Sequence, residues 1–209
     1  MAKAPVVEES EFRHAVKVAS VTGQSKERDV ALLWVAYGTG MMPIELAKLT
    51  VGDYRCADGS VREESAIRAE IAFNGLARNL YWSNKGVVAA VNAYLGARER
   101  DGHAADSDSP LFLTYDGHPF TFTLRKTKAG ADSYSCESLT QIIRRLHTQA
   151  GIEGGSALSA RRTFGVRLHR KGYDLRHIQT LLGAQSITAV KRMVEADPVG
   201  LGAIVSRAI

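Results

Sequence analysis

Apolar side chains recur at helical spacing near the start of the chain, which predicts two packed helices. The first covers residues 8–21 and places Phe12, Val16 and Ala19 on one face. The second covers residues 27–38, and its apolar positions are Val30, Leu33, Trp34 and Tyr37. We therefore expect two helices, each with one buried face, to open the fold.

A glycine-containing break and a hairpin signal follow these helices. The Gly-Thr-Gly sequence at 38–40 ends the second helix, and Pro43 suits the first turn of a short third helix. Short apolar runs at 66–73 and 78–82 are separated by an Asn-Gly pair, which is typical of two strands in a hairpin. A small antiparallel sheet is predicted here.

The remaining sequence predicts mostly helices. A helix over about 84–100 is followed by a polar loop and by a basic, glycine-interrupted segment at 119–134, which we interpret as a mobile loop. The next helix, capped by Ser135 or Ser138, has one apolar face and places Arg144, Arg145 and His147 largely on the other. Four short helices end the chain, at about 158–171, 174–182, 186–195 and 198–207. The predicted fold class is mainly α with a small antiparallel sheet (α+β), in a single domain over residues 1–209.

Composition excludes several classes of protein. Hydrophobic residues make up 45% and charged residues 23% of the 209-residue chain, and no apolar stretch approaches the roughly 18 residues of a membrane-spanning helix. Two cysteines, Cys56 and Cys136, are too few for a disulfide framework or a zinc site, and the six histidines show no metal spacing. The N-terminus has no apolar signal core. We expect a cytoplasmic protein without metal, cofactor, membrane or small-molecule substrate.

Charge is distributed unevenly along the chain. Residues 1–110 have a net charge of −2, whereas residues 111–209 have a net charge of +7. An excess of this kind is typical of a surface that faces phosphates. The second half of the chain is therefore the place to look for contacts with nucleic acid.

Three stretches resemble the catalytic domain of the tyrosine recombinases, also called the phage integrase family. Residues 37–46 (YGTGMMPIEL) are similar to the TGLRxxEL turn of that family, residues 158–164 (LSARRTF) to its HxxRH(T/S)F helix start, and residues 181–187 (LLGAQSI) to LLGHxSI. The order and the gaps also fit, and the resemblance covers roughly residues 8–200. The resemblance implies the fold of that catalytic domain. In that family a tyrosine attacks a DNA phosphodiester, while two arginines, a lysine and two His-type residues stabilise charge or transfer protons.

Most positions that carry this chemistry in the family are replaced in this sequence. The resemblance places Met42 at the first arginine, Phe73 at the lysine, Leu158 and Ala184 at the two His-type residues, and Met193 at the nucleophilic tyrosine. Arg161, the second arginine, and the acidic Glu45 are retained. Lys85 is an alternative for the lysine, although it lies beyond the second strand. The last tyrosine is Tyr173, so a nucleophile would have to come from another protein, and Met193 fits a packed apolar position.

A set of cations is predicted to face DNA. Arg161 and Arg162 begin a helix and suit a phosphate, although Arg161 could instead pair with Glu45. The full predicted DNA-facing set is Arg78, Arg125, Lys126, Lys128, Arg144, Arg145, Arg161, Arg162, Arg167, Lys191 and Arg192, with Arg170 and Lys171 on the same surface.

The resemblance also suggests what surrounds the domain. Integrases usually carry a core-binding domain ahead of this one, and here about seven residues precede the first helix. Such a half-clamp is expected to bind DNA weakly as a monomer, at about 10⁻⁴–10⁻⁶ M. The small-residue stretch at 197–209 is predicted either to dock on a neighbouring protomer or to fold back on its own chain.

Three functions remain open from the sequence. The first is a DNA-binding protein that has lost strand cleavage and acts as a regulator or a recombination accessory factor. The second is an active or trans-complemented site-specific recombinase. The third is a blocking subunit that pairs with an active integrase. The expected partners are double-stranded DNA and either a second copy of this chain or an active integrase.

Overall fold

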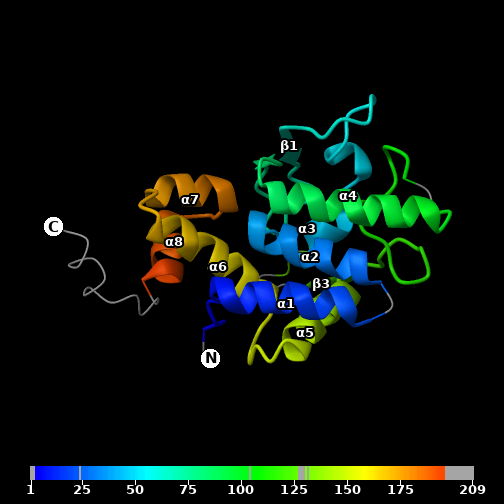
Figure 1. Cartoon of the computed structure of the whole chain (residues 1–209). Helices are drawn as coiled ribbons and strands as arrows, with labels where there is room; N and C mark the ends of the chain where they lie inside the picture. Colours follow the sequence, from blue (N-terminus) through cyan, green and yellow to red (C-terminus); the bar gives the residue numbers. More distant parts are fainter. Residues whose placement is uncertain (1–2, 24, 104, 127–129, 131, 196–209) are drawn as a thin grey trace.

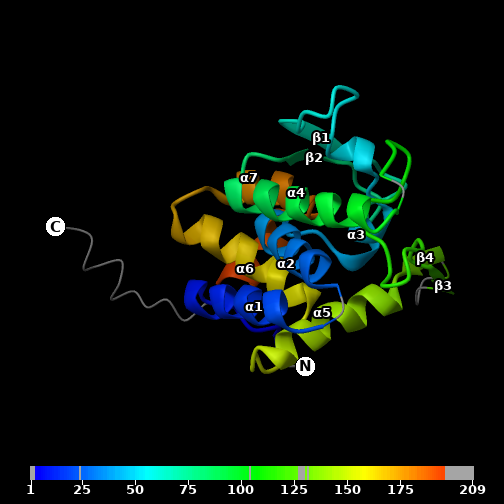
Figure 2. The same cartoon turned by 45° about the vertical axis from the view of Figure 1, so that its right-hand side comes forward.

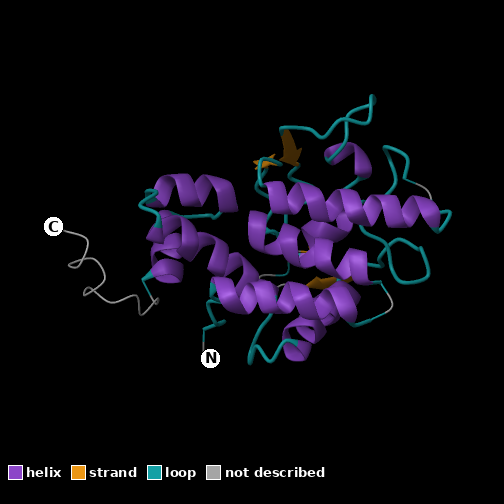
Figure 3. Ribbon diagram, in the orientation of Figure 1, coloured by secondary structure: helices purple, strands orange, loops and turns teal. Residues whose placement is uncertain are grey.

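The structure is a computed structural model that describes residues 3–23, 25–103, 105–126, 130 and 132–195. Helices make up about half of the described chain, with two short two-stranded sheets at its surface (Figure 3). The predicted fold class, mainly helical with a small antiparallel sheet, is confirmed. The second sheet is an addition to that prediction.

Helix α2 (Lys26–Thr39) lies at the centre of the first half of the chain. It packs between α1 (Glu9–Val21) and α4 (Lys85–Arg100), and the short α3 (Pro43–Lys48) follows it in the chain (Figure 1). The ring of Phe12 lies 4.9 Å from the rings of both Trp34 and Tyr37, so the apolar faces predicted for the two opening helices do meet. Gly40 ends α2 in the left-handed conformation at φ 68°, which a glycine adopts at low cost.

The first sheet is shorter than predicted. Strands β1 (Glu64–Ile67) and β2 (Arg78–Tyr81) pair antiparallel, so the expected run at 66–73 is mostly not a strand. Ile71 is buried, and the backbone N–H groups of Ile71 and Ala72 both donate to Arg68 O. The segment between the strands is therefore folded inward as a turn, because burying Ile71 outweighs extending the ladder.

The segment at 119–134 forms a second hairpin rather than the mobile loop that we predicted. Strands β3 (Thr123–Lys126) and β4 (Asp132–Ser135) pair antiparallel, and the hairpin leads into α5 (Glu137–Gln149). The N-cap of α5 is Cys136, without a side-chain hydrogen bond, so neither Ser135 nor Ser138 caps this helix.

His147 is also misplaced by the prediction, because it is buried with the apolar face of α5. Its Nδ1 lies 2.7 Å from Ile143 O and its Nε2 lies 2.6 Å from Tyr37 Oη. Because a carbonyl oxygen can only accept, Nδ1 carries a proton, and Nε2 of the neutral ring accepts from the tyrosine hydroxyl. Burial lowers the pKa of His147, and the hydrogen bond to Ile143 O opposes that shift.

The last described helices are α6 (Ala157–Arg170), α7 (Leu175–Leu182) and α8 (Ile187–Val194), which confirms three of the four predicted C-terminal helices. They enclose a second apolar cluster around Ile178, Leu182 and Val190. Figure 2 shows α6 running beside α1. The predicted helix at 198–207 and the tail at 197–209 lie outside the described residues. Among the described helices, none has both the length and the apolar character to cross a bilayer.

Candidate nucleic-acid interface

A buried ion pair between α3 and β2 forms the floor of the candidate site. Arg78 donates from Nη1 to Glu45 Oε1 at 2.6 Å and from Nη2 to Glu45 Oε2 at 2.8 Å. The same carboxylate accepts the backbone N–H of Met42 at 2.8 Å and that of Phe73 at 3.2 Å. Glu45 thus caps its own helix and fixes the segment before β2, so it organises the site rather than facing solvent.

Arg161 of α6 lies next to this pair and is only 5% exposed. Its Nη1 donates to Gly40 O at 2.9 Å and its Nη2 to Leu182 O at 2.6 Å, while its guanidinium lies 4.9 Å from the centre of the Phe73 ring. Burial lowers the pKa of Arg161 to about 10, an effect that Glu45 opposes and the cation of Arg78 reinforces. Arg161 therefore ties the turn after α2 to the end of α7.

The predicted phosphate contacts of Arg78 and Arg161 do not fit this conformation easily. Both guanidinium groups are buried and already donate to protein acceptors. The alternative of a direct hydrogen bond between Arg161 and Glu45 is also absent among the described contacts, since the carboxylate pairs with Arg78 instead. A phosphate would reach Arg161 only after the bonds to the two carbonyl groups open, so this contact stays a prediction.

The other positions that the family resemblance singled out lie in different surroundings. Phe73 is 44% exposed and covers Arg161, whereas Leu158 is 56% exposed at the start of α6. Ala184 and Met193 both pack against the second apolar cluster. The sulfur of Met193 lies 3.1 Å from where a Cβ on Gly165 would stand, which places the thioether directly against α6.

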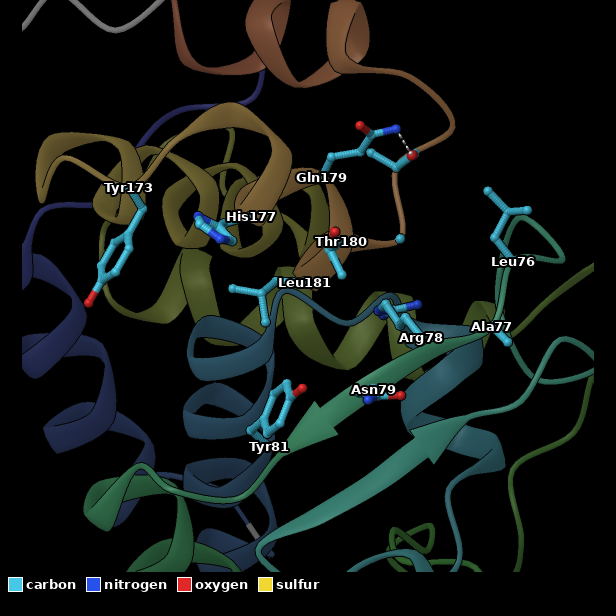
Figure 4. A pocket seen from close by; sticks show the side chains of 12 residues that line it. Leu76, Ala77, Arg78, Asn79, Tyr81, Tyr173, His177, Gln179, Thr180 and Leu181 are labelled. Atoms are coloured by element: carbon cyan, nitrogen blue, oxygen red, sulfur yellow. Dashed lines mark hydrogen bonds between the residues drawn. The ribbon is translucent and has the colours of Figure 1, made fainter.

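An open groove of about 850 Å³ lies between β2 and α7, next to the centre formed by Glu45, Arg78 and Arg161. Tyr81 and Arg78 belong to the β2 wall and Tyr173 and His177 to the other, with Leu181 between Tyr81 and His177 (Figure 4). Gln179 donates to Ala184 O at 3.1 Å and so fixes the turn after α7 at the groove's edge. The sequence analysis did not find this groove, because its walls come from segments about a hundred residues apart.

Three arginines of α6 contact the N-terminal segment rather than forming an open basic surface. Arg162 donates to Ala4 O and to Met193 O. Arg167 pairs with Glu9 at 3.2 Å, and Arg170 with Glu8 at 2.9 Å. In this conformation Glu8, Glu9 and backbone carbonyl groups neutralise or occupy these cations, so the continuous basic surface along α6 stays a prediction that requires these contacts to open. Nothing in the local sequence of α6 shows this, because the partners lie about 160 residues away.

The remaining predicted cations divide between paired and open positions. Arg145 contacts Asp29 at 3.2 Å, Lys126 pairs with Asp132, and Lys191 lies 3.4 Å from Glu195. Arg144 and Arg192 are exposed, and within the described residues neither side chain has an acidic partner. Lys128 lies outside the described residues, and only the backbone of Arg125 is described, in β3. No three His, Cys, Asp or Glu side chains of the described residues come together as a metal site would need.

Sequence comparison identifies the class of protein to which this fold and site belong. The profile of the phage integrase family matches residues 5–198, so the chain belongs to the phage integrase family. Tyrosine recombinase XerC from Herpetosiphon aurantiacus is 27% identical over 172 residues, and its counterpart from Pelobacter propionicus is 26% identical over 166 residues. These alignments cover 82% and 79% of this chain but 49% and 46% of the relatives, so the chain spans about half their length.

Solved structures of recombinases have the same fold. The crystal structure of XerA recombinase superposes with a TM-score of 0.73 at 22% identity, over 99% of this chain and 64% of that one. XerH recombinase bound to a palindromic difH substrate gives a TM-score of 0.68 at 18% identity, over 99% and 54% of the two chains. The Tn1549 transposon integrase in complex with transposon right end DNA gives 0.62 at 14% identity, over 99% and 65%. These similarities establish a tyrosine recombinase catalytic-domain fold.

Proposed function

We propose that this protein binds double-stranded DNA without cleaving it, as a regulator or as an accessory factor for recombination by an active integrase. The observation that carries the proposal is the chemistry around Arg161. The ring of Phe73 covers this arginine, and both of its terminal nitrogens already donate hydrogen bonds to backbone carbonyl groups. Strand cleavage needs cations and proton donors aimed at a developing phosphorane, and removing one such donor typically costs about 10²–10³ in rate.

The residue that the resemblance aligns with the nucleophilic tyrosine supports the same proposal. Met193, which the resemblance aligns with the tyrosine, packs against α6 as part of the second apolar cluster. A thioether has no acidic proton to lose, and its neutral sulfur is too weak a nucleophile to attack a phosphodiester, so this side chain cannot form the covalent phosphotyrosine-type intermediate. DNA binding is supported by the family, by the XerH and Tn1549 structures with DNA, and by the open cations Arg144 and Arg192.

Covalent trapping separates the proposed function from an active recombinase. The full chain is incubated with nicked suicide duplexes, cut at random positions, and then denatured in detergent. We expect no protein to remain attached to DNA. A detergent-resistant adduct in the pure protein would contradict the proposal. An adduct of an active integrase that forms on a given duplex only when this chain is also present would support trans-complementation instead.

A binding experiment tests the positive half of the proposal. Sheared genomic DNA captured by the full chain is sequenced, and the salt dependence of binding is measured for wild type and Arg144→Ala. We expect enrichment of defined sites, and a fall of about 0.9 in the salt slope if Arg144 contacts one phosphate. Lys17→Ala, on the exposed face of α1, is the matched control and is expected to leave the slope unchanged. Absence of DNA affinity, together with binding to an integrase, would favour the blocking subunit.

A further inference from the structure

The β3–β4 hairpin presents an exposed apolar face that the centre around Arg161 does not use. Leu124 and Tyr134 are directly paired across the hairpin, so their side chains share one face. Phe122, two residues before Leu124, continues the same face by the period-two rule. The exposed fractions of Phe122, Leu124 and Tyr134 are 42%, 50% and 52%. Three large apolar side chains are thus exposed together on a projecting element.

This face is held in place by a lysine from α3. The ammonium group of Lys48 lies 5.5 Å from the ring centre of Phe122 and 5.0 Å from that of Tyr134. The same ammonium donates to Glu70 O at 3.1 Å. Because α3 also carries Glu45, the hairpin is tied to the helix that holds the buried ion pair. The rings and the cation therefore form one positioned surface.

The charge around this face favours DNA as its partner. By sequence, the segment 119–134 carries Arg125, Lys126 and Lys128 against the single acid Asp132. Proteins that enter a DNA groove combine apolar side chains, which contact sugars and base edges, with cations that contact the flanking phosphates. An apolar surface that binds another protein is usually depleted of charge at its core, and here lysine lies over the rings themselves.

We propose that the β3–β4 hairpin enters a groove of duplex DNA, with Phe122, Leu124 and Tyr134 against sugars and base edges and Lys48 toward a phosphate. Lys126 pairs with Asp132 in the free protein and exchanges this partner for a phosphate on binding. This inference rests on the proposed DNA-binding function and adds an element to it. Of the three apolar side chains, Leu124 is the one whose replacement is expected to disturb the folded protein least. It is half exposed and takes no part in the contacts of Lys48.

The test compares an apolar and a charged substitution on a fluorescein-labelled duplex of random sequence and on a fragment enriched from the genome. Leu124→Ser is expected to weaken binding about tenfold on the enriched fragment without changing the salt slope, since an apolar contact releases no counterions. Lys126→Gln is expected to lower the salt slope by about 0.9 on both duplexes. Val21→Ser, at a 67% exposed position of α1, is the matched control and is expected to bind as wild type does.

The outcomes separate the two proposals. If wild type binds the duplexes but Leu124→Ser binds as tightly as Val21→Ser, the hairpin inference is wrong and DNA binding stands. If wild type binds neither duplex, the proposed function itself is wrong. If Leu124→Ser abolishes binding to an integrase and leaves DNA affinity unchanged, the face is a protein-docking surface and the inference is overturned. Circular dichroism of each variant confirms that the fold is intact.

Discussion

The buried pair of Glu45 and Arg78 is expected to dominate the stability of the site. Arg78→Met removes two charge-assisted hydrogen bonds of 2.6 and 2.8 Å and leaves a fully buried carboxylate without its partner. Breaking such a pair typically costs about 3–5 kcal/mol. Arg161 remains nearby as a second cation, so we expect a loss near the lower value, about 3 kcal/mol.

Urea unfolding followed by circular dichroism measures this loss. With a slope of about 2 kcal/mol per M urea, a loss of about 3 kcal/mol lowers the unfolding midpoint by about 1.5 M. Arg144→Met, an exposed arginine of α5, is the control and is expected to change the free energy of unfolding by less than about 0.5 kcal/mol.

A double-mutant cycle tests the reasoning further. Glu45→Gln alone leaves two neighbouring guanidinium cations without their anion, so it is also expected to destabilise the protein. In the double variant the pair is already broken, and the combined loss is expected to be at least about 1 kcal/mol smaller than the sum of the single losses. Additive losses, or a loss below about 1 kcal/mol for Arg78→Met, would refute the reasoning.

Three further predictions concern pH, packing and the N-terminal segment. Burial lowers the pKa of His147 in the folded protein, so the unfolded protein takes up a proton at this residue first as pH falls below about 6.5, and the folded state loses stability. The urea midpoint is expected to drop from pH 7.5 to 5.5 less in His147→Gln than in wild type, and an equal drop would contradict this. Gly86→Ala would place a Cβ 2.4 Å from an indole ring and is expected to lose about 1–3 kcal/mol, whereas Gly96→Ala in the same helix meets only an arginine terminus at 3.6 Å and is expected to gain about 0.5–1 kcal/mol. Equal melting shifts for the two alanines would refute the packing argument. Thr163→Val leaves the N–H of buried Val7 without its acceptor and is expected to cost about 1–3 kcal/mol in urea unfolding, with a smaller loss counting against that bond.

Helix positions could be predicted from the sequence because apolar periodicity is a local property. The predicted bounds of the helices now labelled α6 to α8 differ from the observed ones by one residue at most ends. The burial of His147 was also predictable, since it follows Leu139 by eight residues and Ile143 by four, and therefore shares their face. The β3–β4 hairpin was missed although Phe122 and Leu124 alternate with threonines, because the basic and glycine residues around them indicated a loop.

The roles of the arginines could not be predicted, because they depend on partners far away in the chain. The spacing within α6 gives no sign that Arg167 and Arg170 pair with Glu9 and Glu8. The retained Arg161 was identified, but its bonds to Gly40 O and Leu182 O join three distant segments. Local sequence reports which side chains are cations, and tertiary structure decides what they bind.

The contact between the start of the chain and α6 has a consequence for the order of folding. Val7 is 1% exposed, and its N–H donates to Thr163 Oγ1 across a sequence separation of 156 residues. At about 5–20 residues per second, the 156 residues between them take roughly 8–30 s to synthesise. During that time Val7 and the acids Glu8 and Glu9 are without their partners on α6. Residues 7–9, although they are synthesised before the rest of this fold, are therefore among the last of it to reach their native places, and translation through α6 sets the earliest time at which this part of the core closes.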